Sequence, residues 1–194
     1  MKKLFSKKSF QMRDEVSCLS QLSEIHLKAI VIGDYGVGKT SLCRRYATGM
    51  FEEDYKPTIG VDVYTKTLEI PDFGIIRLQI WDTAGEERFK RIYPKYWLGA
   101  RIVLVVFDIT SRKTFESVDE WIENARMHLK DAQIVLIGNK KDLEPYREVD
   151  EEKGRKKAEE LSLLGYIETS AKTGENVDKA FKMAIDKILE KMTR

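Results

Sequence analysis

Apolar residues in this sequence gather into short runs, and the spacing within each run predicts a particular element. Residues 26–32, 101–108 and 134–139 are mainly apolar and rich in β-branched side chains. Runs of this kind predict strands buried on both faces of a parallel sheet. Residues 60–70 instead alternate between Val or Thr and mostly polar residues. That alternation predicts an edge or half-exposed strand.

A turn and several helical segments complete the pattern. Residues 71–74 have turn chemistry, so residues 75–81 should pair back as the second strand of a hairpin. Residues 166–169 predict a short last strand. Apolar residues at helical spacing predict four helices. These cover residues 41–47, a segment from Phe115 to Leu129, a segment from the N-cap Asp150 to about Leu163, and residues 177–188. Strands that alternate with helices predict an α/β fold with a doubly wound sheet, which binds ligands at the carboxyl ends of its strands.

Length and composition narrow the class of protein. The chain has 194 residues, enough for one domain with a substantial core, and its net charge is +2. A net charge this close to zero gives no indication that the protein binds nucleic acid. Two cysteines, Cys18 and Cys43, argue against a disulfide framework. No apolar run reaches the length of a membrane-spanning helix, and we expect a cytoplasmic monomer.

Residues 1–25 differ from the rest, so we place the folded domain at residues 26–194. Lysines surround Leu4, Phe5 and Phe10 in this N-terminal basic extension. Two interpretations are open. The segment is either a solvated, flexible tail or a short amphipathic stretch that makes weak contact with an anionic membrane surface, which would leave the protein peripheral to a membrane.

The strongest motif runs from Gly33 to Thr40 and matches the phosphate-binding P-loop, Gly-x-x-x-x-Gly-Lys-Thr. It lies between a predicted strand and a predicted helix, which is the context that the motif requires. Glycines let successive backbone N–H groups point at phosphate oxygens, and the helix N-terminus adds positive charge. Lys39 would reach the β- and γ-phosphates, and the Thr40 hydroxyl would bind Mg²⁺. The expected phosphate-binding residues are Asp34, Tyr35, Gly36, Val37, Gly38, Lys39, Thr40 and Ser41.

Three further motifs follow other predicted strands. Asp82-Thr-Ala-Gly85 follows the second hairpin strand, and its carboxylate could hold Mg²⁺ directly or through water. Asn139-Lys-Lys-Asp142 follows the next-to-last strand. Asp142 can accept hydrogen bonds from the N1–H and the amine of guanine, a donor pair that adenine lacks, while Asn139 and Lys140 brace the loop and cover the ring.

The third of these motifs, Ser170-Ala171-Lys172, follows the last strand and can offer a backbone N–H to the guanine O6. Taken singly, each of the three is also compatible with ordinary turn punctuation. Their order, spacing and position at strand ends together predict a guanine-nucleotide site.

With these motifs in place, the chain resembles a small GTPase of the Ras superfamily, nearest to the Rab family. Rab-like stretches occupy residues 59–63, 81–89 and 96–100, and the resemblance extends over about residues 27–192. It implies a P-loop NTPase small G-domain with a six-stranded, mostly parallel sheet and about five helices. It also implies GTP and GDP as ligands, Mg²⁺ as cofactor, and two switch regions. Effectors, exchange factors and GTPase-activating proteins would bind through switch I, about residues 50–60, and switch II, about residues 83–96.

The resemblance also implies particular residue roles. Thr58 in switch I would bind Mg²⁺ together with Thr40 and Asp82. Phe51 would pack edge-on against the guanine, and Tyr55 would contribute to the nucleotide site. Lys39, Gly85 and Glu86 would be the catalytic residues, with the Gly85 N–H directed at the γ-phosphate.

Four departures from the family pattern bear on function. Glu86 stands where the family has a Gln that orients the attacking water, and an ionised carboxylate can only accept hydrogen bonds. We therefore expect slow hydrolysis, unless Glu86 points to solvent and a partner positions the water, or Glu86 acts as a base. Tyr35 is larger than its counterparts and lies either over the phosphates or outward. No cysteine follows the last helix, so we expect no C-terminal prenylation of this chain. Val63 also replaces an aromatic residue expected on the effector-facing surface.

Two other functions remain as alternatives. The chain could be a GTP-binding interaction module that scarcely hydrolyses GTP, a reading that depends on Glu86. A P-loop kinase or ATPase would use the same glycine loop but would not need Asn139 and Asp142.

Overall fold

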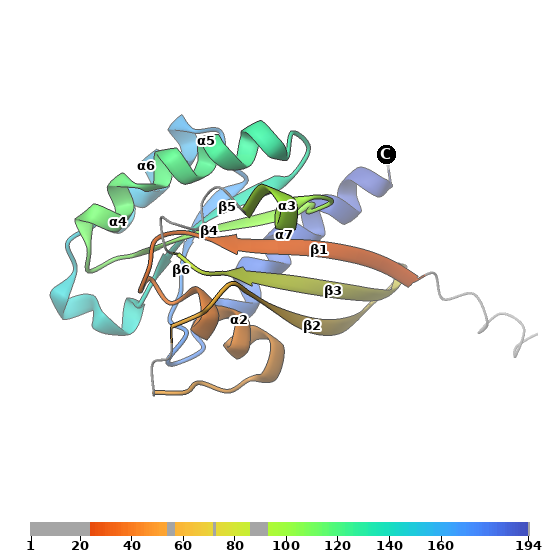
Figure 1. The fold of residues 1–194 in the computed structure, drawn as a ribbon, viewed down its shortest axis with the longest axis horizontal. Helices are drawn as coiled ribbons and strands as arrows, with labels where there is room; N and C mark the ends of the chain where they lie inside the picture. The colour runs from red at the N-terminus through yellow and green to blue at the C-terminus, as the bar shows by residue number, and fades with distance from the viewer. Residues whose placement is uncertain (1–23, 54–56, 72, 86–92, 194) are drawn as a thin grey trace, which may run out of the picture.

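The computed structural model describes residues 24–53, 57–71, 73–85 and 93–193. Its centre is a six-stranded sheet with the strand order β2-β3-β1-β4-β5-β6 (Figure 1). The strands are β1 Glu24–Ile32, β2 Val61–Ile70, β3 Gly74–Thr83, β4 Ile102–Asp108, β5 Gln133–Asn139 and β6 Gly165–Glu168. Only the β2–β3 pair is antiparallel. The predicted six-stranded, mostly parallel sheet is confirmed.

Helices cover both faces of this sheet. They are α2 Lys39–Thr48, α3 Tyr93–Trp97, α4 Arg112–Glu116, α5 Val118–His128, α6 Glu151–Glu160 and α7 Val177–Met192, with a 3₁₀ helix η2 at Lys141–Tyr146. Two buried clusters hold the layers together. One packs α2 and α7 against one face of the sheet, and the other packs α3, α5 and α6 against the opposite face. Figure 1 shows α4, α5 and α6 on one side and α2 and α7 on the other.

The hairpin behaves as the alternation of residues 60–70 predicted. β2 is the edge strand of the sheet, and its residues are alternately half-buried and exposed. Tyr64 and Leu68 face the core while Val63 and Thr65 face outward. The side chains that point inward are thus the even-numbered ones.

Two predicted helices have different limits in the structure. The segment from Phe115 to Leu129 is divided between α4 and α5 at Ser117, although the Ser117 N–H still donates to the carbonyl of Lys113. The helix after Asp150 ends at Glu160 rather than near Leu163, because Ser162 adopts a left-handed conformation at φ 49° that ends it. Neither α3 nor η2 was predicted, since both are shorter than two full turns of an α-helix.

Parallel pairing brings the four motifs to one edge of the sheet. β1, β3, β4, β5 and β6 all run in the same direction, and Asp108 at the end of β4 is in register with Asn139 at the end of β5. The P-loop, Asp82, Asn139 and the loop after β6 therefore share the carboxyl edge, as predicted for this fold. No helix within the described residues is both long and apolar enough to cross a bilayer.

Candidate functional site

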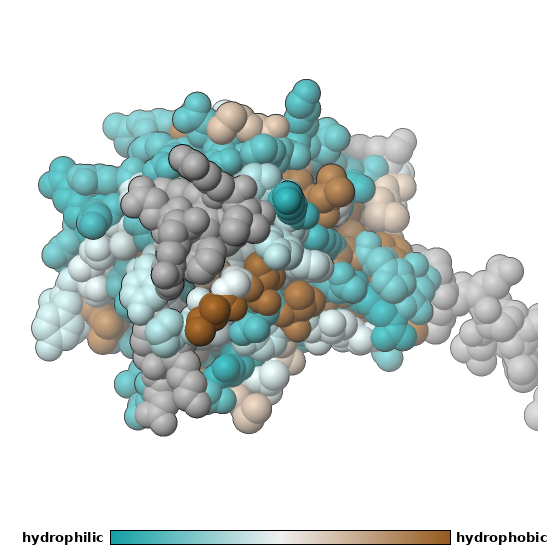
Figure 2. All heavy atoms as spheres, viewed as in Figure 1, coloured by the Kyte–Doolittle hydropathy of each residue, from teal (hydrophilic) through white to brown (hydrophobic). Residues whose placement is uncertain are grey.

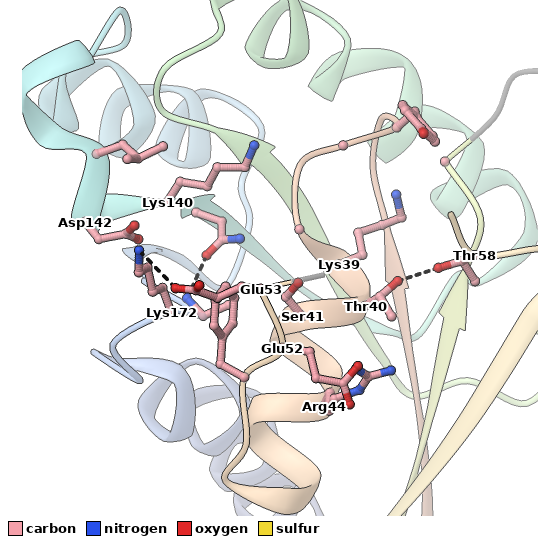
Figure 3. A pocket seen from close by; sticks show the side chains of 18 residues that line it. Lys39, Thr40, Ser41, Arg44, Glu52, Glu53, Thr58, Lys140, Asp142 and Lys172 are labelled. Carbon is pink, nitrogen blue, oxygen red and sulfur yellow. Dashed lines mark hydrogen bonds and ion pairs between the residues drawn. The ribbon is translucent and has the colours of Figure 1, made fainter. Parts of the chain in front are cut away.

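A pocket of about 340 Å³ opens at this carboxyl edge (Figure 3). It is lined by fourteen of the residues that the sequence predicted. They are Tyr35, Gly36, Gly38, Lys39, Thr40, Ser41, Phe51, Thr58, Gly85, Asn139, Lys140, Asp142, Ala171 and Lys172. In Figure 3, Asp142 and Lys172 lie at one end of the pocket, and Lys39, Thr40 and Thr58 lie at the other.

Four of the predicted residues that the structure describes do not line the pocket. They are Asp34, Val37, Asp82 and Ser170, and the last three are buried. Tyr55 and Glu86 lie outside the described residues, so their roles stay predictions.

Close contacts with neighbouring elements fix the shape of the P-loop. A Cβ added to Gly33 would lie 2.1 Å from the carbonyl oxygen of Val106 on β4, and Gly33 has a φ of +140°. A Cβ on Gly38, at φ +92°, would lie 2.4 Å from Nδ2 of Asn139. Both positions therefore require glycine, for steric as well as conformational reasons. Side chains here would push the loop away from the sheet edge.

Lys39 is held inside the loop that precedes it. Its Nζ donates to the backbone carbonyl of Asp34 at 2.8 Å, and only 6% of the residue is exposed. Burial lowers the pKa of Lys39 to about 8, although the nearby Asp82 and Asp34 carboxylates act in the opposite direction. A buried ammonium group is poorly solvated. An anionic ligand that forms an ion pair with it therefore stabilises its charged form.

Three side-chain oxygens converge beside Lys39. The Thr40 hydroxyl donates to Oδ2 of Asp82 at 2.6 Å and lies 2.5 Å from the Thr58 hydroxyl, which is itself 3.4 Å from the same carboxylate oxygen. Burial raises the pKa of Asp82 to about 6, against the hydrogen bond from Thr40 and the charge of Lys39. The other oxygen, Oδ1, is buried and accepts no hydrogen bond from the described residues.

This oxygen cluster fits a magnesium ion. Mg²⁺ prefers oxygen ligands and is usually held by one or two carboxylates together with substrate phosphates and water. One buried carboxylate with an unsatisfied oxygen and two hydroxyls meet that description. Among the described residues no group of three or more His, Cys, Asp or Glu side chains could hold a metal. An ion here would therefore depend on oxygens that the ligand brings.

The opposite end of the pocket is braced by Asn139. Its Nδ2 donates to the carbonyl of Val37 at 2.9 Å, and its Oδ1 accepts from the Thr169 hydroxyl at 3.0 Å and from the Ala171 N–H at 3.3 Å. A single buried amide thus joins the P-loop to the loop after β6.

Lys140 and Asp142 follow β5 at the start of the 3₁₀ helix η2. Oδ1 of Asp142 accepts a hydrogen bond from the Ser170 hydroxyl at 2.5 Å. Nζ of Lys140 forms an ion pair with Oδ2 of Asp108 at 2.7 Å, and Lys140 has a left-handed φ of 68°. These contacts fix both side chains from β4 and from the loop after β6.

Sequence reasoning missed several residues that line the pocket or support the loops around it. Arg45 on α2 donates from Nε to the carbonyl of Ala171 at 2.8 Å and from a terminal nitrogen to the carbonyl of Lys172. Arg44, Glu52, Glu53 and Leu143 line the pocket. Arg44 pairs with Glu52, and Glu53 lies 3.7 Å from Nζ of Lys172. These residues belong to no short motif, so only their three-dimensional neighbours reveal them.

Tyr35 and Phe51 both reach the pocket. Tyr35 lines the pocket, and about half of its surface is exposed. Phe51 is half-buried against the core on the α2 and α7 side, and the Arg45 guanidinium lies 5.9 Å from its ring centroid. Its exposed part is available to a ligand in the pocket.

Comparison with known proteins agrees with this geometry. The model of the Ras family matches residues 28–190. Ras-related protein Rab-12 from mouse is 42% identical over 171 residues, which cover 88% of this chain and 70% of the relative, and its human counterpart gives the same values. Ras-related protein RABA6b from Arabidopsis thaliana is 43% identical over 168 residues, covering 86% of this chain and 72% of the relative. The chain therefore belongs to the Ras family and is a Rab-like small GTPase.

Proposed function

We propose that this protein is a guanine-nucleotide-dependent molecular switch that binds GTP and GDP with Mg²⁺ and hydrolyses GTP slowly. The observation that carries the proposal is the layout of the pocket. A carboxylate suited to guanine, Asp142, lies at one end, while a buried ammonium group and an oxygen cluster suited to phosphate and Mg²⁺ lie at the other.

Asp142 is the proposed source of base specificity. Because Ser170 holds one of its oxygens, the carboxylate has a fixed direction before a ligand arrives. Guanine presents two donors, N1–H and the exocyclic amine, whereas adenine presents an acceptor at N1. Binding adenine would leave the carboxylate without donors, and that loss is the physical basis of discrimination. The loop containing Ser170, Ala171 and Lys172 offers a backbone N–H toward the base.

The phosphate end has the complementary chemistry. Lys39 and the backbone N–H groups of the P-loop bind the β- and γ-phosphates. Thr40, Thr58 and Asp82 are the residues that would hold Mg²⁺, which when bound neutralises part of the phosphate charge. The proposed switch function depends on Thr58, which lies in the loop before β2. If Thr58 binds the ion, the position of this loop depends on the bound nucleotide.

Slow hydrolysis is proposed on the identity of residue 86. Lys39 would stabilise charge on the transferred phosphoryl group, and Gly85 would offer its N–H to it. Glu86 cannot donate a hydrogen bond when ionised, so it would orient water less well than an amide, and the phosphates would repel its charge. The extreme form of this proposal is a GTP-bound interaction module with hardly any turnover.

Partners would bind through residues 50–60 and 83–96. Ile59, Val63 and Tyr96 are large apolar residues with at least 40% of their surface exposed, and all three belong to these regions or to the adjacent strand β2. Figure 2 shows a patch of apolar surface on a face of the molecule that is otherwise mainly hydrophilic. We propose that effectors, exchange factors and activating proteins contact this surface. We further propose a cytoplasmic monomer whose membrane contact is peripheral.

A nucleotide-binding experiment tests the central proposal. Calorimetry with GDP and ADP in the presence of Mg²⁺ should show strong preference for GDP. In Asp142→Asn that preference should fall by about a hundredfold or more. The variant should gain xanthosine diphosphate binding, because the Asn amide donates to the carbonyl that replaces the guanine amine. Asp131→Asn, at an exposed loop position, is the matched control. Preference for ADP, or an Asp142→Asn variant with unchanged selectivity, would overturn the proposal.

A further inference from the structure

The geometry points to Trp121 as a positioning residue that holds the Asp34 carboxylate away from the phosphate end of the pocket. This inference rests on the proposed function. Nε1 of Trp121, on α5, donates to Oδ1 of Asp34 at 2.7 Å. The two residues are 87 positions apart, so the tertiary fold alone brings them together.

Asp34 occupies a sensitive position in the P-loop. Its backbone carbonyl accepts the hydrogen bond from Nζ of Lys39 at 2.8 Å. A Cβ added to Gly85 would lie 2.5 Å from that carbonyl oxygen and 2.5 Å from the Lys39 Nζ. Asp34 is therefore in contact with two residues that we assign to the γ-phosphate.

The side chain of Asp34 nevertheless stays off the pocket wall. The next two residues, Tyr35 and Gly36, line the pocket, but Asp34 does not. The hydrogen bond to Trp121 accounts for this difference, because it directs the carboxylate toward α5. An ionised Asp34 carboxylate that pointed into the pocket would repel a polyphosphate strongly, because solvent screens charges only weakly inside a pocket.

Trp121 is well suited to fix that direction. It is 2% exposed and belongs to the buried cluster that packs α5 and α3 against the sheet. A buried indole has little rotational freedom. Its N–H can only donate a hydrogen bond, so it suits an acceptor such as a carboxylate oxygen. A hydrogen bond to a charged acceptor is also stronger than one between neutral groups.

Loss of the indole N–H should affect GTP more than GDP. Without its donor, the Asp34 carboxylate is free to rotate toward the phosphates. The γ-phosphate adds the charge nearest to Lys39 and Gly85, the two residues beside Asp34. We expect Trp121→Phe to lower the ratio of GTP-analogue affinity to GDP affinity by about tenfold.

The test is a double-mutant cycle in the full chain, read by calorimetry with GDP and a non-hydrolysable GTP analogue in Mg²⁺ buffer. Asp34→Asn keeps an oxygen acceptor but removes the charge, and its own ratio is the reference for the double variant. Adding Trp121→Phe to Asp34→Asn should leave the ratio at that reference, because no charge remains to repel the phosphates. A purely structural role for the indole predicts no such rescue. Trp97→Phe, which removes another buried indole of the same cluster, should leave the ratio unchanged.

Two results would overturn the inference: a Trp121→Phe ratio equal to wild type, or a double variant as impaired as Trp121→Phe. If Trp121→Phe does not fold, benzothienylalanine at position 121 removes the N–H while it keeps the bicyclic volume, and the same outcomes apply. Failure of the proposed function is distinguishable, because the wild-type chain itself would then show no guanine-nucleotide binding.

Discussion

The hydroxyl oxygen of Thr58 lies 2.5 Å from the hydroxyl oxygen of Thr40, across 18 positions of sequence. Both hydroxyls also reach Oδ2 of Asp82, at 3.4 Å and 2.6 Å respectively. The loop before β2 is therefore tied to the first turn of α2 through the oxygens that we assign to Mg²⁺. Removing either the ion or a hydroxyl should loosen the same connection.

The first prediction concerns magnesium and nucleotide release. Chelation of Mg²⁺ with EDTA should speed GDP release from the wild-type protein by about tenfold or more, because a cation that neutralises phosphate charge is lost. In Thr40→Val the acceleration should be much smaller, since one ligand is already missing. Stopped-flow release of a fluorescent GDP measures both rates. Thr48→Val, at the other end of α2, is the matched control and should respond to EDTA as the wild type does. Equal acceleration in Thr40→Val would contradict the assignment.

The second prediction concerns Arg45, which supports the loop after β6. Its guanidinium donates to the backbone carbonyls of Ala171, Lys172 and Gly49, so the loop after β6 and the end of α2 are joined by one side chain. Arg45→Met should speed GDP release by about tenfold, because these carbonyls lose charge-assisted hydrogen bonds and the base-contacting loop loosens. Arg112→Met, which breaks only an exposed pair with Glu116, should leave the release rate unchanged. An unchanged rate in Arg45→Met would show that the loop holds its shape without the arginine.

The third prediction concerns the buried ion pair between Arg147 and Glu168. Two guanidinium nitrogens donate to the two carboxylate oxygens of Glu168, at 2.7 Å and 2.8 Å, and the Tyr166 hydroxyl donates to one of them at 2.8 Å. Burial alone would raise the pKa of Glu168, but the hydrogen bonds from Arg147 and Tyr166 and the Arg147 charge outweigh it, so the pKa is lowered from its ordinary 4.5.

A carboxylate with a lowered pKa stabilises the fold when it is ionised. This contribution is complete above pH 4.5, the pKa expected in the unfolded chain, and is lost as the pH falls through the lower folded-state value. Denaturant unfolding should therefore show a difference between wild type and Glu168→Gln at pH 7 that shrinks below pH 4.5. Arg147→Met should cost about 3 kcal/mol at pH 7, because it strands a buried charge. Glu151→Gln, in an exposed pair, should change stability by less than about 0.5 kcal/mol. A pH-independent difference for Glu168→Gln would refute this account.

Local patterns were enough to predict much of the fold. Continuous apolar runs marked β4 and β5, alternation marked β2, and the four motifs fell at strand ends because parallel strands share one edge. The early end of α6 was not predictable in this way, because it depends on the left-handed conformation of Ser162, a non-glycine residue.

The residues of the candidate site also fall into a group that the sequence could predict and a group that it could not. Lys39, Thr40, Asp82, Asn139 and Asp142 belong to motifs that directly follow predicted strands, so the sequence was enough to predict that they lie near one another at the carboxyl edge of the sheet. Arg45 and Trp121 act through contacts that span 126 and 87 positions, and each looks like an ordinary helix residue in sequence. Residues that support the site from a distance are visible only when the elements that carry them are packed together.

The last prediction returns to Glu86. Glu86→Gln should raise single-turnover GTP hydrolysis by about tenfold, because an amide both donates and accepts hydrogen bonds and so can orient the attacking water, whereas an ionised carboxylate only accepts and is repelled by the phosphates. Single-turnover hydrolysis of bound GTP, followed by phosphate release, measures the chemical step apart from nucleotide exchange. Glu116→Gln, at an exposed position on α4, controls for the loss of one negative charge. An unchanged or slower rate in Glu86→Gln would contradict the prediction and would instead favour Glu86 as a base, or a partner that supplies the water-orienting group.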